Sequence, residues 1–248
     1  MITIKSRTEI EKMRKAGKIT GDALREIEKY IKPGVSTLEL DKIAFDFIKK
    51  RGATPSFLHY NGFPGSICAS PNSWVVHGIP SKDIVLKEGD IISIDMGAQN
   101  DGYHGDAART YAVGNISDEA KKLIEVTKQS FFEGIKYATH GAKLGDVSAA
   151  IQEYVESNGF SVVRDLVGHG IGKNLHEDPN VPNFGHRGRG VKLVGGMTIA
   201  VEPMVNAGRF DVVVLDDDWT VETEDGSLSA HYENTILITK GECEILTL

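Results

Sequence analysis

Two aspartates lie on either side of a short turn in the stretch "GDIISIDMGAQNDGYHGDAARTY", residues 89–111. Asp95 ends the apolar run "IISID", which is typical of a buried strand, and Asp106 follows the turn. A two-residue turn at Asn100-Asp101 places Asp95 directly opposite Asp106, whereas a turn one residue later makes them diagonal neighbours. In both registers the carboxylates share one face of a hairpin, where directly opposed Cβ atoms are about 4.5–5.5 Å apart. Their repulsion predicts a positive group between them.

The same acidic pattern occurs again in the second half of the chain. "EGDIISIDM" matches "GGMTIAVEP" at an offset of 107 residues, so that Asp95 falls on Glu202. "HGDAART" matches "HYENTIL" at an offset of 127, so that Asp106 falls on Glu233. Because an uncompensated cluster of four carboxylates would be costly to bury, we expect these side chains to share a common ligand.

Helical segments repeat with the strands. "GVSTLELDKIAFDFIKKRGAT" lies over "GAKLGDVSAAIQEYVESNGFS" at the offset of 107, with glycines coinciding at both ends. Ser6 with Glu9, and Ser36 with Glu39, have the spacing of capping boxes that begin helices, and the second of these helices should end at Gly52.

This repetition predicts an α+β fold. We expect one domain over residues 1–248, built from pseudo-symmetric halves of about 1–115 and 116–248. Helices would cover one face of a mainly antiparallel sheet, and the acidic strands would meet where the halves join.

Histidines complete the candidate site. "VVHGIP" resembles "VGHGIG", which suggests that His77 and His169 are quasi-equivalent, and His176 follows seven residues after the second. Because these three lie in glycine-flanked segments, we interpret them as ligand and acid/base groups. We expect structural roles for the remaining histidines: His59, His104, His140, His186 and His231.

Four carboxylates and one imidazole, with no thiolate, are hard ligands. Such a set suits two divalent ions, among which Mn²⁺, Fe²⁺, Co²⁺, Zn²⁺ and Ni²⁺ are candidates. Bridging carboxylates hold paired ions about 3.5–4 Å apart, a geometry that activates hydroxide and polarises a carbonyl group. The chemistry implied by these residues is hydrolysis.

Composition is that of an ordinary globular protein. The 248 residues are 40% hydrophobic and 25% charged, with a net charge of −7 that argues against nucleic-acid and anionic-membrane partners. Cys68 and Cys243 are the only cysteines, so no disulfide framework is expected. Since the sequence also has no apolar stretch of signal-peptide or transmembrane length, we expect a cytoplasmic protein.

The ordered motifs "SIDMGA", "HGDAART", "GHGIG", "VEPM" and "YENT" resemble the methionine aminopeptidase family of pita-bread metallohydrolases. The resemblance covers the whole chain and is strongest to the minimal type I form. It implies that Asp106 and Glu233 bridge two divalent ions, that His169 and Glu202 complete one metal site, and that Asp95 binds the other ion.

The resemblance also implies catalytic roles and a substrate. His77 and His176 would contact the scissile amide, and Glu202 would move the proton. The substrate would be the N-terminal methionine of a nascent polypeptide whose second residue is small. The family pattern further suggests a monovalent cation near Asn72 and Ser229, and a monomeric enzyme that acts near the ribosome.

A methionine pocket follows from the same resemblance. Aromatic and sulfur groups suit a thioether, since each sulfur–aromatic contact contributes ~0.3–1.5 kcal/mol. Phe57, Phe63 and Leu175 differ from the residues frequent in bacterial members, which leaves the detailed pocket shape open. The implied substrate-binding residues are Tyr60, Phe63, Cys68, His77, His176 and Trp219, with Phe57 and Leu175 nearby.

Two other interpretations fit parts of the pattern. Xaa-Pro aminopeptidases and prolidases share the fold and the ligand set, but they normally carry a further N-terminal domain, for which we expect no room here. A non-catalytic pita-bread binding module is the second alternative. Such modules have lost ligands, whereas this sequence retains the full set.

Overall fold

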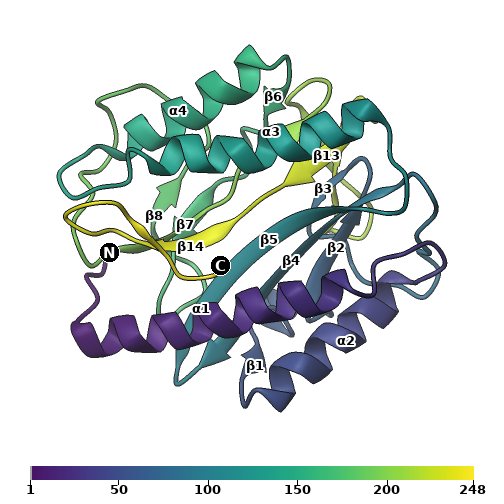
Figure 1. Ribbon diagram of the computed structural model, residues 1–248, viewed down its shortest axis with the longest axis horizontal. Helices are drawn as coiled ribbons and strands as arrows, with labels where there is room; N and C mark the ends of the chain where they lie inside the picture. Colours follow the sequence, from purple (N-terminus) through teal and green to yellow (C-terminus); the bar gives the residue numbers. More distant parts are fainter. Residues whose placement is uncertain (1) are drawn as a thin grey trace.

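The computed structural model describes residues 2–248, and its helices form two pairs (Figure 1). The first pair is α1 (Arg7–Glu28) and α2 (Thr37–Lys50), and the second is α3 (Asp118–Ile135) and α4 (Leu144–Ser157). Both predicted capping boxes are confirmed, because the Ser6 and Ser36 side chains each accept the backbone N–H three residues ahead. Within residues 2–248, no helix is both long and apolar enough to cross a membrane.

The strands form two larger sheets and two small ones. The first larger sheet contains β1 (Thr54–Pro55), β2 (Ile67–Pro71), β4 (Ile91–Asn100) and β5 (Tyr103–Ala112). The second contains β7 (Gly168–Gly170), β8 (Glu177–Val181), β9 (Thr198–Val201), β14 (Asn234–Leu237) and β15 (Glu244–Ile245). One small sheet contains β3 (Trp74–Val76), β11 (Val212–Val214) and β12 (Val221–Thr223). The other contains β6 (Ser161–Val162), β10 (Met204–Asn206) and β13 (Ser229–His231). Every pairing between these strands is antiparallel.

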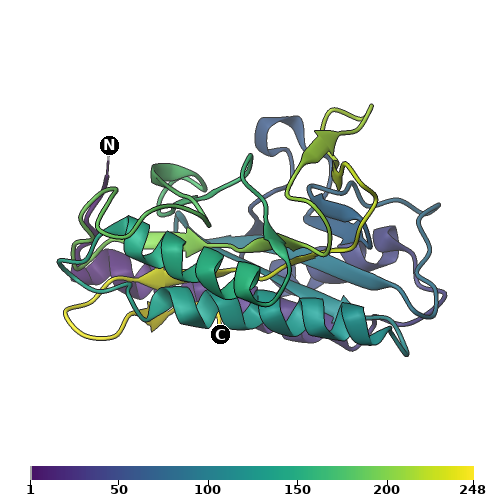
Figure 2. The ribbon, with the colours of Figure 1, turned by 90° about the horizontal axis from the view of Figure 1, so that it is seen from above.

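Both helix pairs cover the same face of the strands, and Figure 2 shows this layering from above. Each pair buries its own apolar cluster against the sheet. One cluster includes Leu24, Leu40 and Ile94, and the other includes Leu123, Ile151 and Ile199. Since apolar burial is the main stabilising contribution, these two clusters hold the helices against the strands. The predicted α+β arrangement is confirmed.

The helices and strands recur at the spacing expected from the sequence. When the first half is shifted by 107 residues, the first and last residues of α2 fall on those of α4, and those of β1 fall on those of β6. The same shift places the first residue of β4 on the first residue of β9. The same offset places the last residue of α1 on the last residue of α3. The repeated sequence pattern therefore reflects a repeated order of helices and strands.

The hairpin of β4 and β5 adopts the second of the two registers. Asp101 (φ 49°) and Gly102 (φ 78°) form the turn, and both have the positive φ of a type I′ hairpin. Gly97 consequently pairs with Asp106, so that Asp95 and Asp106 are diagonal neighbours on one face.

Backbone hydrogen bonds join the two larger sheets where Asp106 and Glu233 lie. The Glu233 N–H donates to the Ala108 carbonyl at 3.0 Å, and the Ala108 N–H donates to the Glu233 carbonyl at 3.3 Å. The Asp106 N–H donates to Thr235 Oγ1 at 3.0 Å. The acidic strands of the two halves are thus neighbours.

The expected equivalence of His77 and His169 is wrong. His169 lies on β7, which pairs with β9, and the counterpart of β9 in the first half is β4. β4 pairs with β2, whereas His77 follows β3, which pairs with β12. The likeness of "VVHGIP" to "VGHGIG" is local, because a short glycine-flanked histidine places no constraint on strand pairing.

A close contact between α1 and β5 gives a first prediction. A Cβ at Gly105 would lie 2.6 Å from Gly17 Cα and 2.7 Å from Gly17 N, so the helix must shift to admit it. We expect Gly105→Ala to lower the free energy of unfolding by about 1–3 kcal/mol. Gly241→Ala is the matched control, because nothing lies within 4 Å of its new Cβ. Urea unfolding measures both, and equal midpoints would contradict the packing argument.

Candidate active site and metal centre

A cavity of 810 Å³ gathers the residues expected to do chemistry. Its walls come from both halves of the chain, so neither half contains the whole site. The sequence-derived residues that line it are Tyr60, Phe63, Cys68, His77, Asp95, Asp106, His169, His176, Glu202, Trp219 and Glu233, together with Phe57 and Leu175.

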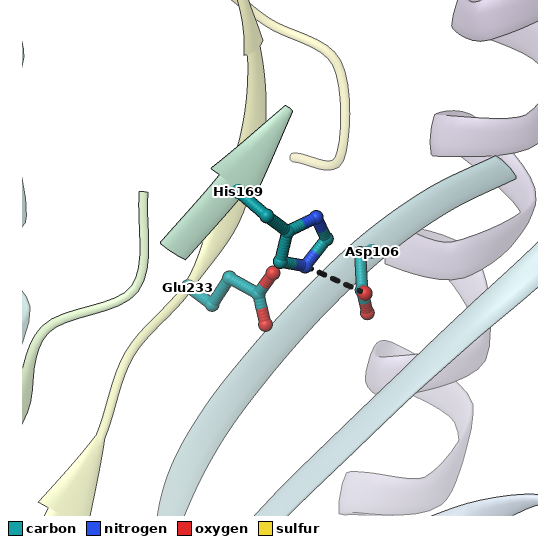
Figure 3. Close-up of side chains that lie close together, drawn as sticks. All are labelled: Asp106, His169 and Glu233. Carbon is teal, nitrogen blue, oxygen red and sulfur yellow. Dashed lines mark ion pairs between the residues drawn. The ribbon is translucent and has the colours of Figure 1, made fainter. Parts of the chain in front are cut away.

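The expected metal ligands project from strands or from residues directly beside them. Asp95 is on β4, Asp106 on β5 and His169 on β7, while Glu202 follows β9 and Glu233 precedes β14. Ligand atoms of Asp106, His169 and Glu233 lie within 4.8 Å of one another, and Figure 3 shows these side chains pointing toward a common centre. A site on strands is held by the sheet, which limits its freedom to distort.

Several buried oxygens of this cluster have no hydrogen-bond partner among the described residues. They are Asp95 Oδ1, Asp106 Oδ1 and Glu233 Oε1. Burial and neighbouring carboxylates raise the pKa values of Asp95, Glu202 and Glu233 well above their usual range, and burial raises that of Asp106 to about 7. Bound cations would satisfy these oxygens and offset the repulsion, so the donors fit divalent metal ions.

His169 has the protonation state that a metal ligand needs. Its Nδ1 lies 2.8 Å from the Gly170 carbonyl, which can only accept, so Nδ1 carries the proton. The Nε2 lone pair then faces Asp106 Oδ2 at 3.8 Å and Glu202 Oε1 at 3.7 Å. Burial lowers the pKa of His169 to about 3, which keeps the ring neutral and free to bind a cation.

The other two candidate histidines face the same cavity. His77 has φ 60°, a left-handed conformation that costs energy for a residue with a side chain, and such strain is concentrated at functional sites. Burial, with His176 nearby, lowers the pKa of His77 to about 4. His176 Nδ1 is hydrogen-bonded to Tyr60 Oη at 2.9 Å, and its ring centroid lies 4.1 Å from that of His169.

An apolar pocket adjoins the carboxylates. Trp219 meets Phe63 edge-on, with ring centroids 5.1 Å apart, and lies 6.5 Å from the His77 ring. Cys68 pairs with Asp95 across β2 and β4, and burial raises the pKa of its thiol, which remains protonated. The walls are therefore aromatic and sulfur-containing, and they suit an unbranched apolar side chain.

The sequence predicts a structural role for His231, but this residue lies against the site carboxylates. Both of its ring nitrogens are buried without a hydrogen-bond partner in the described chain, and Nε2 lies 3.9 Å from Glu202 Oε2 and 4.0 Å from Glu233 Oε2. By contrast, His104 is hydrogen-bonded to Ser56 Oγ at 2.8 Å. The position of His231, two residues before Glu233 in a strand-like run, was the available sequence signal.

Comparison with known proteins identifies the family. The model of metallopeptidase family M24 matches residues 11–240. The chain belongs to this M24 family. Curated relatives of this M24 member include the methionine aminopeptidase of Clostridium acetobutylicum, 62% identical over all of this chain and 99% of the relative. The methionine aminopeptidase 1 of Bacillus subtilis is 56% identical over all of this chain and 99% of the relative.

Solved M24 structures agree with the fold. The methionine aminopeptidase of Thermotoga maritima superposes with a TM-score of 0.98 at 51% identity, covering 100% of this chain and 99% of that one. An Xaa-Pro dipeptidase of Bacillus anthracis gives a TM-score of 0.79 at 26% identity, covering 98% of this chain and 61% of that one. The pita-bread fold is thus confirmed, and the likeness to methionine aminopeptidases is the greater of the two.

The raised carboxyl pKa values predict that metal binding releases protons. At pH 7 the metal-free cluster of this M24 enzyme retains protons, because burial raises the pKa of Asp106 to about 7 and raises the pKa values of the other three carboxyl groups well above their usual range. Metal ligands must be deprotonated, so binding Mn²⁺ should expel protons, and affinity should rise with pH. Calorimetric titration in two buffers of different ionisation enthalpy measures the released protons. Heats that do not depend on the buffer would contradict this prediction.

Proposed function

We propose that this M24 enzyme removes N-terminal methionine from polypeptides whose second residue is small, with two bound divalent metal ions. One observation carries the proposal: a converging set of four carboxylates and one imidazole lies beside an aromatic and sulfur-lined pocket in a single cavity. The likeness to methionine aminopeptidases along the full chain supports it.

The metal centre would be held by the residues that converge on it. Asp106 and Glu233 would bridge the ions, His169 and Glu202 would complete one site, and Asp95 would complete the other. When bound, the ions would supply the Lewis acidity that activates water and polarises the scissile carbonyl. Co²⁺, Mn²⁺, Fe²⁺, Zn²⁺ and Ni²⁺ all remain candidates, since hard oxygen and imidazole donors accept each of them.

The side chains of the cavity would handle the substrate and its protons. Burial and the nearby Asp106 raise the pKa of Glu202, which favours proton binding, so Glu202 would accept a proton and return it to the leaving amine. His77 and His176 have lowered pKa values and are neutral. They can therefore hydrogen-bond to the scissile amide, and His176 would stabilise the oxygen that gains charge.

Selection of methionine would depend on the apolar pocket. A thioether side chain would lie against Trp219, Phe63 and Cys68, with Tyr60 holding His176 at the pocket edge. We further propose a cytoplasmic, monomeric enzyme that acts on nascent chains near the ribosome. A monovalent cation would sit near Asn72 and Ser229, which are neighbours because the Ser229 N–H donates to the Asn72 carbonyl at 2.9 Å.

A peptide assay of protein stripped with EDTA tests this function. Added Mn²⁺ or Co²⁺ should restore methionine release from Met-Ala-Ser, with much less from Met-Leu-Ser and none of Ala from Ala-Pro-Ser. Cleavage of Ala-Pro-Ser alone would assign an Xaa-Pro peptidase instead. No cleavage together with no bound metal would identify a binding module.

Two substitutions separate metal binding from catalysis. Asp106→Asn removes a bridging charge, so we expect lost metal and lost activity. His176→Gln should retain both metal ions but lower kcat by about 10²–10³-fold, the usual cost of removing one donor to a developing oxyanion. Metal content and methionine release measure the two effects. Loss of metal in His176→Gln would contradict the assigned role.

A further inference from the structure

The N-terminal segment, through Thr3 and Lys5, contacts Glu177 beside the loop that carries His176. Lys5 Nζ lies 2.7 Å from Glu177 Oε2, and the two side chains are only 5% and 8% exposed. Thr3 Oγ1 donates to the same Glu177 oxygen at 2.6 Å. Glu177 directly follows His176, so the ion pair acts one residue from a histidine of the cavity.

Glu177 connects this segment to the rest of the loop. Its second oxygen, Oε1, accepts the Asn174 N–H at 3.2 Å. Both carboxylate oxygens are therefore used, one toward the N-terminal segment and one within the loop. A buried and fully hydrogen-bonded charge of this kind holds its neighbours in one arrangement, because breaking it leaves an unpaired charge.

Close packing and backbone bonds fix both partners. A Cβ at Gly172 would lie 2.6 Å from Glu177 Oε1 and 2.7 Å from Lys5 Cε, so the loop approaches the ion pair without a side chain between them. The Gly172 carbonyl accepts the His104 N–H, and the Lys5 N–H donates to the Gly196 carbonyl at 2.8 Å. The ion pair thus joins two segments that are each bonded to the main fold.

The His176 ring has few side-chain contacts beyond those of its own backbone. Its hydrogen bond is to Tyr60, whose ring it stacks on, and the His169 ring lies tilted against it with centroids 4.1 Å apart. Thr3 and Glu177 also line the cavity, so the anchoring occurs beside the reacting groups.

We propose that Lys5, acting through Glu177, is a positioning residue that holds His176 in place for catalysis. This inference rests on the proposed function, because it assigns His176 to the peptidase reaction. Lys5 itself contacts neither the cavity nor the expected metal ligands, so it does not serve as a catalytic group.

Substitution of Lys5 tests the proposal in the full-length enzyme. Lys5→Met keeps the length of the stem and removes the charge, so kcat for Met-Ala-Ser should fall about 10–100-fold, since small displacements of a reacting group are costly. KM and metal content should stay within about twofold, because methionine and metal contacts remain. Lys5→Arg should restore most of kcat. Lys173→Met is the matched control, since Lys173 lies in the same loop but is exposed and 3.7 Å from Glu9.

A measurement independent of activity separates this inference from the proposed function. The ring signal of His176 in NMR, assigned with His176→Gln, should shift or broaden in Lys5→Met and stay unchanged in Lys173→Met. If the parent enzyme releases no methionine, the proposed function fails, and this signal still decides whether Lys5 holds His176. An unchanged signal and unchanged kcat with a lowered melting temperature would overturn the proposal. If Lys5→Met does not fold, Thr3→Val is the alternative variant, because it removes one hydrogen bond to the same carboxylate. It should give a smaller shift of the His176 signal and a smaller loss of kcat. An unchanged signal and an unchanged kcat in Thr3→Val would overturn the proposal.

Discussion

The mutual repulsion of buried carboxylates is the constraint around which this protein is organised. One cavity holds four buried carboxylates: Asp95, Asp106, Glu202 and Glu233. Burial raises the pKa of each, and neighbouring carboxylates raise the pKa values of all but Asp106 further. Groups in such a place would separate if they were on mobile loops. The fold keeps them together by placing them on paired strands or directly beside them, and their uncompensated negative charge makes the cavity suited to divalent metal ions.

The repeated architecture supplies that rigidity. Each half covers its strands with a helix pair and an apolar cluster, and hydrogen bonds between Ala108 and Glu233 join the halves at the site. Each half supplies two of the carboxylates, and the second half alone supplies the imidazole of His169.

Burial keeps the histidines of this site uncharged. His77 and His169 are neutral because burial lowers their pKa values, which leaves them able to form hydrogen bonds or bind a cation. Each is placed by backbone features: a left-handed φ at His77 and a strand at His169. His176 lies on a loop, where Tyr60 and His169 contact its ring and the ion pair of Lys5 and Glu177 holds the neighbouring residue.

The sequence by itself determined the features that depend on local spacing and residue type. The capping boxes of Ser6 and Ser36, the helix and strand repeat and the four carboxylates that share the cavity all follow from short patterns along the chain. Tertiary structure decided what depends on contacts between distant segments. Only the fold selected the register of the hairpin, placed His77 and His169 at non-equivalent positions of the repeat and brought His231 to the carboxylates, because strand pairing is a non-local choice. The pairing of Lys5 with Glu177 joins residues 172 positions apart, and no local pattern records a contact of that range.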